Sequence, residues 1–105
     1  MKRYRIQITA RALFDMEEIY NYIAEQLQVP EVAMRQYNRI ADAIKTLDIF
    51  PERVKLMETR EEFARGLRQM PVDNFSVFFL IKEENVIITN VLYSASNIAN
   101  RLRDV

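Results

Sequence analysis

The chain of 105 residues contains no cysteine and no histidine. Without cysteine it has no disulfide framework and no thiolate nucleophile. Without histidine it lacks the usual imidazole general base and the commonest ligand of transition metals. These absences exclude thiol and imidazole chemistry, and we expect no metal site and no cofactor.

Glycine, proline and long apolar runs are also scarce. One glycine and three prolines leave little room for long irregular loops. No apolar run approaches the roughly 18 residues that indicate a membrane-spanning helix. The basic residues near the start, Lys2, Arg3 and Arg5, are not followed by the apolar segment of a secretion signal. We therefore expect one domain over residues 1–105, located in the cytoplasm.

The charged residues balance, with fifteen basic and fifteen acidic side chains. Proteins that dock on nucleic acid usually present a basic surface, so the chain is not expected to bind DNA directly. Eleven of the fifteen basic residues are arginines. The planar guanidinium group suits directed contacts to carboxylates, phosphates and backbone carbonyls. Taken singly, however, each arginine is better explained as part of the solvated surface.

The first half of the chain predicts a strand followed by a helical hairpin. Tyr4, Ile6 and Ile8 alternate with polar residues, as in a half-buried strand. Apolar residues then recur at steps of three and four on both sides of Pro30, until Pro51 ends the pattern. The two apolar stripes comprise Leu13, Met16, Tyr20, Ile23 and Leu27, and then Ala33, Tyr37, Ile40, Ile44 and Leu47.

The last third of the chain predicts a β-hairpin. Residues 75–81 and 86–93 are rich in β-branched and aromatic side chains and flank a short polar link. Because both runs are apolar at odd and even positions, both faces of the sheet should be covered. A surface loop is predicted at 52–65, a further strand at 66–70 and a terminal helix at 97–102. The resulting order, β-α-α-β-β-β-α, predicts an α+β domain with a small twisted antiparallel sheet packed against a two-helix hairpin.

Six short segments follow one another in a distinctive order. They are YRIQIT at 4–9, DMEEIYNYIA at 15–24, PER at 51–53, GLR at 66–68, VDNF at 72–75 and VLY at 91–93. Together they resemble the RelE/ParE superfamily of toxins from type II toxin–antitoxin modules, especially the ParE-like plasmid stabilisation branch. The resemblance covers nearly the whole chain and implies the RelE/ParE-like fold.

The resemblance to RelE-like toxins implies a possible ribonuclease site. Those toxins cut messenger RNA on the ribosome, which requires a base, an acid and cations around one phosphate. On that reading the catalytic residues are Arg68, as an electrostatic clamp, and Tyr93, which orients the phosphate or relays a proton. Arg68 also suits a structural ion pair with Asp73, and Tyr93 suits a half-buried aromatic position. Ser76 and Ser96 stand where these relatives often have arginine, which disfavours efficient RNA cleavage.

The resemblance to ParE favours a different activity. ParE toxins inhibit DNA gyrase through protein–protein contacts and need no catalytic residues of their own. We therefore expect a ParE-like gyrase inhibitor, not an enzyme, that a cognate antitoxin neutralises. Two alternatives remain: a RelE-like, ribosome-dependent mRNA endoribonuclease, and a degenerate, non-toxic module that only binds the antitoxin.

The expected partners are the antitoxin and a target, which is either DNA gyrase or the ribosome with its mRNA, with no membrane involved. The C-terminal segment of the antitoxin should lay an amphipathic helix into a groove beside the helical hairpin and add an extended piece along the sheet. The residues expected to bind the antitoxin or the target are Arg60, Arg65, Arg101 and Arg103.

Overall fold

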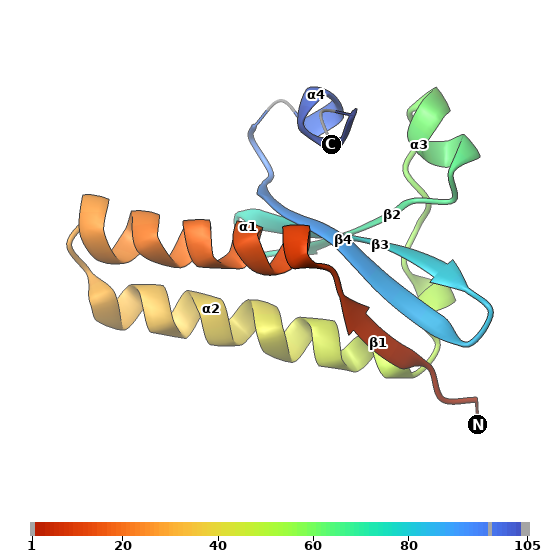
Figure 1. Cartoon of the computed structure of the whole chain (residues 1–105), viewed down its shortest axis with the longest axis horizontal. Helices are drawn as coiled ribbons and strands as arrows, with labels where there is room; N and C mark the ends of the chain where they lie inside the picture. Colours follow the sequence, from red (N-terminus) through yellow and green to blue (C-terminus); the bar gives the residue numbers. More distant parts are fainter. Residues whose placement is uncertain (1, 97, 104–105) are drawn as a thin grey trace.

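The computed structural model describes residues 2–96 and 98–103, which form a four-stranded sheet with a long helical hairpin on one face (Figure 1). This is the predicted α+β architecture. None of the helices in these two ranges has the length and apolarity needed to cross a membrane. The elements are β1 (Arg5–Ile8), α1 (Ala10–Asn21), the π-helical turn η1 (Tyr22–Gln26), α2 (Pro30–Lys45), the 3-10 turns η2 (Thr46–Asp48) and η3 (Pro51–Arg53), α3 (Arg60–Ala64), β2 (Arg68–Val72), β3 (Phe75–Lys82), β4 (Asn85–Tyr93) and α4 (Ile98–Arg103).

The sheet has the strand order β1-β4-β3-β2. The pairs β2–β3 and β3–β4 are antiparallel, as the hairpin pattern predicts. However, β1 pairs with β4 in parallel, with Arg5 opposite Asn85 and Ile8 opposite Ile88, so the sheet is mixed and not wholly antiparallel. A parallel neighbour needs a long crossover, which the helical hairpin and two strands supply here. Hydrophobic periodicity identifies a strand but carries no information about the direction of its partner.

The first helical segment buries only part of the predicted stripe: Met16 and Ile23 are buried and Tyr20 is partly buried, but the two ends of the stripe are not. Thr9 caps α1 by accepting a hydrogen bond from the backbone N–H of Ala12 at 3.1 Å. Ala12 and Met16 are buried, whereas Leu13 and Leu27, which the stripe assigned to the core, are 43% and 54% exposed. The prediction placed the largest apolar side chains inside, but α1 lies against β4 with a smaller residue, Ala12, at the contact.

The second helix buries the predicted stripe. Ala33, Ile40, Ile44 and Leu47 are all at most 2% exposed, and the largely covered Tyr37 packs against the same core. This core also contains side chains from the face of the sheet that the hairpin covers, namely Val72, Val77, Phe79, Val86, Ile88 and Val91. The hairpin and one face of the sheet therefore enclose the main core.

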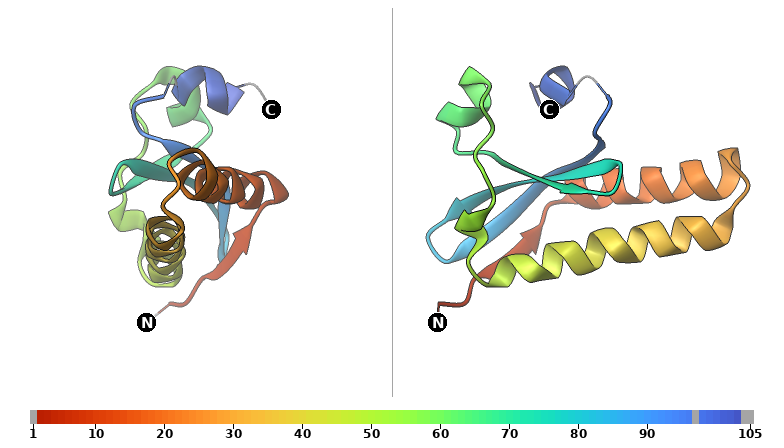
Figure 2. Two further views of the ribbon diagram at one scale, coloured as in Figure 1. Left: turned by 90° about the vertical axis from the view of Figure 1, so that its left-hand side faces the viewer. Right: turned by 180° about the vertical axis from the view of Figure 1, so that it is seen from behind.

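The opposite face of the sheet is also covered, as predicted from the doubly apolar strands. Phe78 and Leu92 pack there against Met57, Leu67 and Leu102. Leu102 belongs to α4, which lies with α3 on the side of the sheet away from the hairpin (Figure 2). The terminal helix was predicted from residue 97, which lies outside the described residues, and it continues to Arg103.

The segment predicted as a surface loop contains the helix α3. Glu62 on this helix is fully buried and accepts hydrogen bonds from the hydroxyl of Thr59 and from the guanidinium of Arg103. Gly66 follows with φ +77°, a left-handed conformation that suits glycine at a helix end. As a result β2 begins at Arg68 and not at residue 66. The sequence did not predict α3, because its inward-facing residue is a glutamate and a run of charged residues is typical of an exposed loop.

Candidate interaction site

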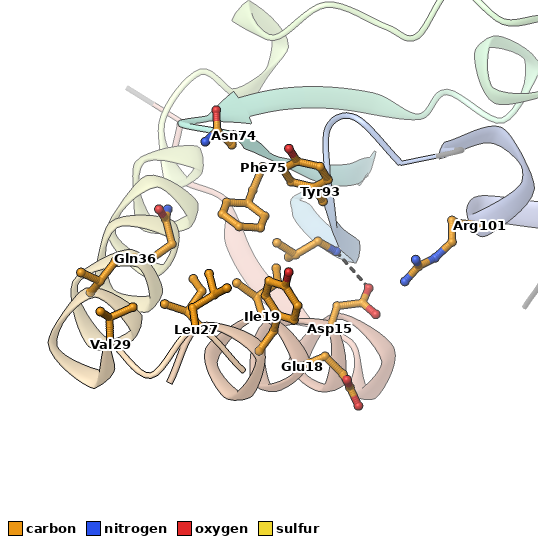
Figure 3. Close-up of a pocket in the computed structure, with 14 residues that line it drawn as sticks. Asp15, Glu18, Ile19, Leu27, Val29, Gln36, Asn74, Phe75, Tyr93 and Arg101 are labelled. Carbon is orange, nitrogen blue, oxygen red and sulfur yellow. Dashed lines mark hydrogen bonds between the residues drawn. The ribbon is translucent and has the colours of Figure 1, made fainter. Parts of the chain in front are cut away.

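The helical hairpin extends beyond the sheet (Figure 1). A groove of about 690 Å³ lies where it leaves the sheet (Figure 3). Its walls are α1 with η1, the first half of α2, the start of β3 and the end of β4, with one side chain from α4. The apolar lining comprises Ile19, Tyr22, Ile23, Leu27, Val29, Val32, Phe75 and Val91. The polar lining comprises Asp15, Glu18, Gln36, Asn74, Tyr93 and Arg101.

Several apolar side chains of the groove are open to solvent. Tyr22 is 58% exposed, Leu27 is 54% exposed and Val32 is 40% exposed. They belong to η1, the link after it and the start of α2, which form the end of the hairpin that extends beyond the sheet (Figure 1). A contiguous apolar patch of this kind in a hollow is typical of a surface that binds a partner. The predicted groove beside the hairpin is therefore present.

Asp15 lies at one end of the groove but is almost completely buried, with 4% exposed. Its carboxylate accepts a hydrogen bond from the backbone N–H of Val91 at 3.0 Å (Figure 3). It also lies 3.4 Å from the guanidinium of Arg11. Burial raises the pKa of Asp15, while the hydrogen bond from Val91 and the charge of Arg11 oppose this shift. The strand β1 ends opposite Ile88, so it offers no backbone carbonyl to the N–H of Val91 further along β4. The carboxylate of Asp15 accepts the hydrogen bond from this N–H instead. Asp15 thus anchors α1 to β4.

Arg101 and Tyr93 line the same end of the groove. The side chain of Arg101 extends from α4 toward Asp15 (Figure 3). Its guanidinium makes no salt bridge of 4 Å or less with any residue that the structure describes. Tyr93 is 51% exposed and packs edge-to-face on Phe75, with ring centroids 5.8 Å apart. This end of the groove therefore offers one accessible cation beside an aromatic surface.

Arg68 lies far from Tyr93 along the sheet. Arg68 is aligned with Phe79, whereas Tyr93 is aligned with Phe75. Four residues of extended strand separate these positions, which corresponds to roughly 13 Å. The structure therefore does not bring the two predicted catalytic residues together.

The guanidinium of Arg68 donates hydrogen bonds to backbone carbonyl oxygens and forms no salt bridge with a carboxylate in the described residues. It donates to the carbonyl oxygens of Val54 at 2.6 Å and of Glu52 at 3.3 Å. The suggested ion pair with Asp73 is wrong, because Asp73 binds Arg39 through two contacts of 2.7 and 2.9 Å. Arg68 begins β2 and Asp73 follows its end, so the strand itself keeps the two side chains apart.

Neutral groups occupy the positions where RNA-cleaving relatives often have arginine. Ser76 is buried and its hydroxyl accepts from the amide of Gln69 at 3.0 Å and lies 2.8 Å from the hydroxyl of Ser94. The hydroxyl of Ser96 donates to the backbone carbonyl of Tyr93 at 2.6 Å. Both predicted serine positions are therefore engaged in local hydrogen bonds.

The remaining predicted arginines fall into two settings. Arg103 forms salt bridges within the protein, with Glu62 at 3.0 Å and with Glu61 at 2.9 Å. The hydrogen bond from Arg103 lowers the pKa of Glu62, and the same contact raises the pKa of Arg103. Arg60 is exposed at the start of α3 and Arg65 is exposed just after its end, and neither residue lines the groove. The four arginines were predicted to act together. The structure separates them, because Arg60 and Arg65 lie at the two ends of α3, a helix that the sequence pattern did not predict.

Comparison with known proteins places the chain in a family. Residues 6–98 match the family described as "ParE toxin of type II toxin-antitoxin system, parDE". The chain belongs to the ParE toxin family. It is accordingly a ParE-type toxin of a type II toxin–antitoxin system, and its resemblance to the RelE/ParE superfamily is confirmed.

Individual relatives agree with this assignment. Toxin ParE3 of Caulobacter vibrioides is 30% identical over 88 residues, which cover 84% of each chain. The chromosomal ParDE system from P. aeruginosa superposes with a TM-score of 0.74 at 21% identity, over 87% of this chain and 96% of that one. The toxin–antitoxin complex RelBE2 from Mycobacterium tuberculosis superposes with a TM-score of 0.62 at 17% identity, over 87% and 98%. These two structures confirm the fold.

Proposed function

We propose that this ParE-family toxin inhibits DNA gyrase by protein–protein contacts and does not cleave RNA. The observation that carries the proposal is the separation of Arg68 from Tyr93, with Arg68 bound to backbone carbonyls. Cleavage at a ribose requires base, acid and cation to converge on one phosphate. Inhibition by binding requires no such convergence, and the neutral Ser76 and Ser96 are compatible with it.

We further propose that a cognate antitoxin occupies the groove. An amphipathic helix binds such a groove by placing side chains at helical spacing into its apolar floor. Tyr22, Leu27 and Val32 supply the apolar contacts, and Arg101 at the polar end attracts a carboxylate of the antitoxin. Of the four predicted arginines, Arg101 is the one placed to do this, since it lines the groove.

The activity is tested with purified toxin in two assays run side by side. One measures DNA supercoiling by gyrase, and the other measures mRNA cleavage on programmed ribosomes. We expect inhibited supercoiling, intact mRNA and unchanged inhibition by Arg68→Ala. Robust cleavage that disappears in Arg68→Ala, with supercoiling unaffected, would show that the toxin is a ribonuclease.

The groove is tested with the purified cognate antitoxin. Leu27→Ser should weaken its binding at least about tenfold, because Leu27 lies in the apolar lining. Leu13→Ser is the matched control, since Leu13 is 43% exposed on α1 and lies outside the lining. Equal losses in the two variants would place the antitoxin elsewhere.

A further inference from the structure

The short helix α4 reaches three different parts of the protein with three consecutive residues. Arg101 lines the groove, and its side chain extends into the polar end of the groove (Figure 3). Leu102 is 3% exposed and packs in the core on the face of the sheet opposite the hairpin. Arg103 forms a salt bridge with Glu62 of α3. One turn of helix therefore joins the groove to contacts that lie outside the groove.

The contacts of Leu102 and Arg103 hold α4 in place. Six residues are too few to form a stable helix by themselves. Leu102 and the partly buried Ile98 supply the apolar contact with the sheet. Glu62 is 0% exposed, and two nitrogens of Arg103 donate to its carboxylate at 3.0 and 3.1 Å. Because a buried carboxylate without a cation is costly, this ion pair favours the docked position of α4.

Arg101 has no comparable anchor of its own. Its guanidinium makes no salt bridge of 4 Å or less within residues 2–96 and 98–103. Because a helix turns by 100° per residue, Arg101 and Arg103 leave α4 on nearly opposite sides. The position of Arg101 in the groove therefore depends on how its neighbours dock the helix.

We infer that Glu62 and Arg103 are positioning residues for antitoxin binding, because their ion pair holds α4 where Arg101 meets a carboxylate of the antitoxin. The inference rests on the proposed function, in which the antitoxin occupies the groove. Neither residue of the pair lines the groove, so the pair acts through Arg101. When α4 detaches, the groove loses its cation, and the apparent affinity falls with the fraction of molecules in which α4 is docked.

The test measures the affinity of the purified cognate antitoxin for variants that loosen α4 in two ways. Glu62→Gln/Arg103→Gln removes the ion pair, leaves no charge buried alone and keeps the net charge. Leu102→Ala removes the apolar contact instead. Val86→Ala is the matched control, since Val86 is 0% exposed but belongs to the main core and lies outside the groove lining. Each variant is made alone and together with Arg101→Ala, and amide hydrogen exchange shows whether α4 alone has detached.

The ion-pair variant and Leu102→Ala should each weaken antitoxin binding at least about fivefold, the lower end of typical couplings between two sites. Both should also reduce the salt dependence of binding, as Arg101→Ala does, because the same cation is lost from the groove. Combined with Arg101→Ala, they should cause no further loss, since the residue that they position is already absent. Val86→Ala should bind the antitoxin like the wild type.

Failure of the inference and failure of the proposed function give different results. Unchanged affinity in the ion-pair variant, or in Arg101→Ala alone, would refute the inference. A loss that is equally large with and without Arg101→Ala would refute it as well, because the pair would then act through the general stability of the fold. In all these cases the antitoxin site stands if Leu27→Ser still weakens binding. If Leu27→Ser binds like the wild type, the groove is not the antitoxin site and both proposals fail.

Discussion

Asp15 should stabilise the fold through its hydrogen-bond acceptor and not through its charge. Its carboxylate accepts from the backbone N–H of Val91 in a position that is 4% exposed. Removal of the acceptor in Asp15→Ala leaves a buried N–H unsatisfied, which costs about 1–3 kcal/mol. Alanine regains about 0.5 kcal/mol of helix propensity, so the net loss should be about 0.5–2.5 kcal/mol.

Asp15→Asn is the matched substitution, because the amide oxygen can still accept from Val91. The ion pair with Arg11, which is 41% exposed, contributes at most about 1 kcal/mol. Asp15→Asn should therefore stay within about 1 kcal/mol of the wild type at pH 7. Urea unfolding of both variants measures these differences, with unchanged m-values as the sign that the unfolded states are comparable.

The pH dependence gives a second readout. Burial raises the folded-state pKa of Asp15, so this group favours folding below its unfolded pKa of about 4 and loses that contribution as pH rises through the folded pKa. The stability of Asp15→Asn relative to the wild type should therefore increase from pH 3 to pH 7. If Asp15→Asn is as unstable as Asp15→Ala at pH 7, the charge matters more than the acceptor and the reasoning is refuted.

Three further predictions concern stability. The folded-state pKa of Glu62 is lowered, so its ionised carboxylate should stabilise the fold above its ordinary pKa, and this stabilisation should be lost as pH falls through the lowered pKa. Glu62→Gln should remove this loss of stability at acid pH, as measured by urea unfolding between pH 7 and pH 2. Thr9→Ala removes the cap of α1 and a hydrogen bond to the carbonyl of Ile88, and should cost about 1–2 kcal/mol in the same assay, whereas no effect would mean that water replaces the cap. Leu102→Ala empties a buried position and should cost about 2–5 kcal/mol if α4 stays docked; a smaller cost with fast amide exchange confined to α4 would show that the helix detaches alone.

The strongest periodic patterns predicted the fold well. The stripe of α2 and the β3–β4 hairpin are where the sequence placed them, because each buries or partly buries every residue that its pattern marks as apolar, with Tyr93 as the exception. The direction of β1 was not predictable in this way, since its partner lies about 80 residues further along the chain. The helix α3 was missed for a similar reason, because Glu62 finds its partner Arg103 only in the folded chain.

The candidate site was predicted less completely than the fold. The sequence indicated a groove beside the hairpin but assigned Leu27 to the core, although this residue lies exposed in the groove. Helical periodicity gives the apolar face of a helix but not the point at which the sheet stops covering it. For the same reason Arg101 was not distinguished from Arg103, although one lines the groove and the other is bound to Glu62.

The parallel pairing of β1 with β4 also constrains when the toxin can fold during synthesis. The first strand of the chain finds its partner only after residues 85–88 have been made. Until then β1 has no neighbour in the sheet, and the groove lacks Val91 and Tyr93. Contacts so distant in sequence form late, after the local helices. A growing chain therefore acquires the groove only after β4 has been made, and a chain that stops before β4 should have neither a complete sheet nor a groove.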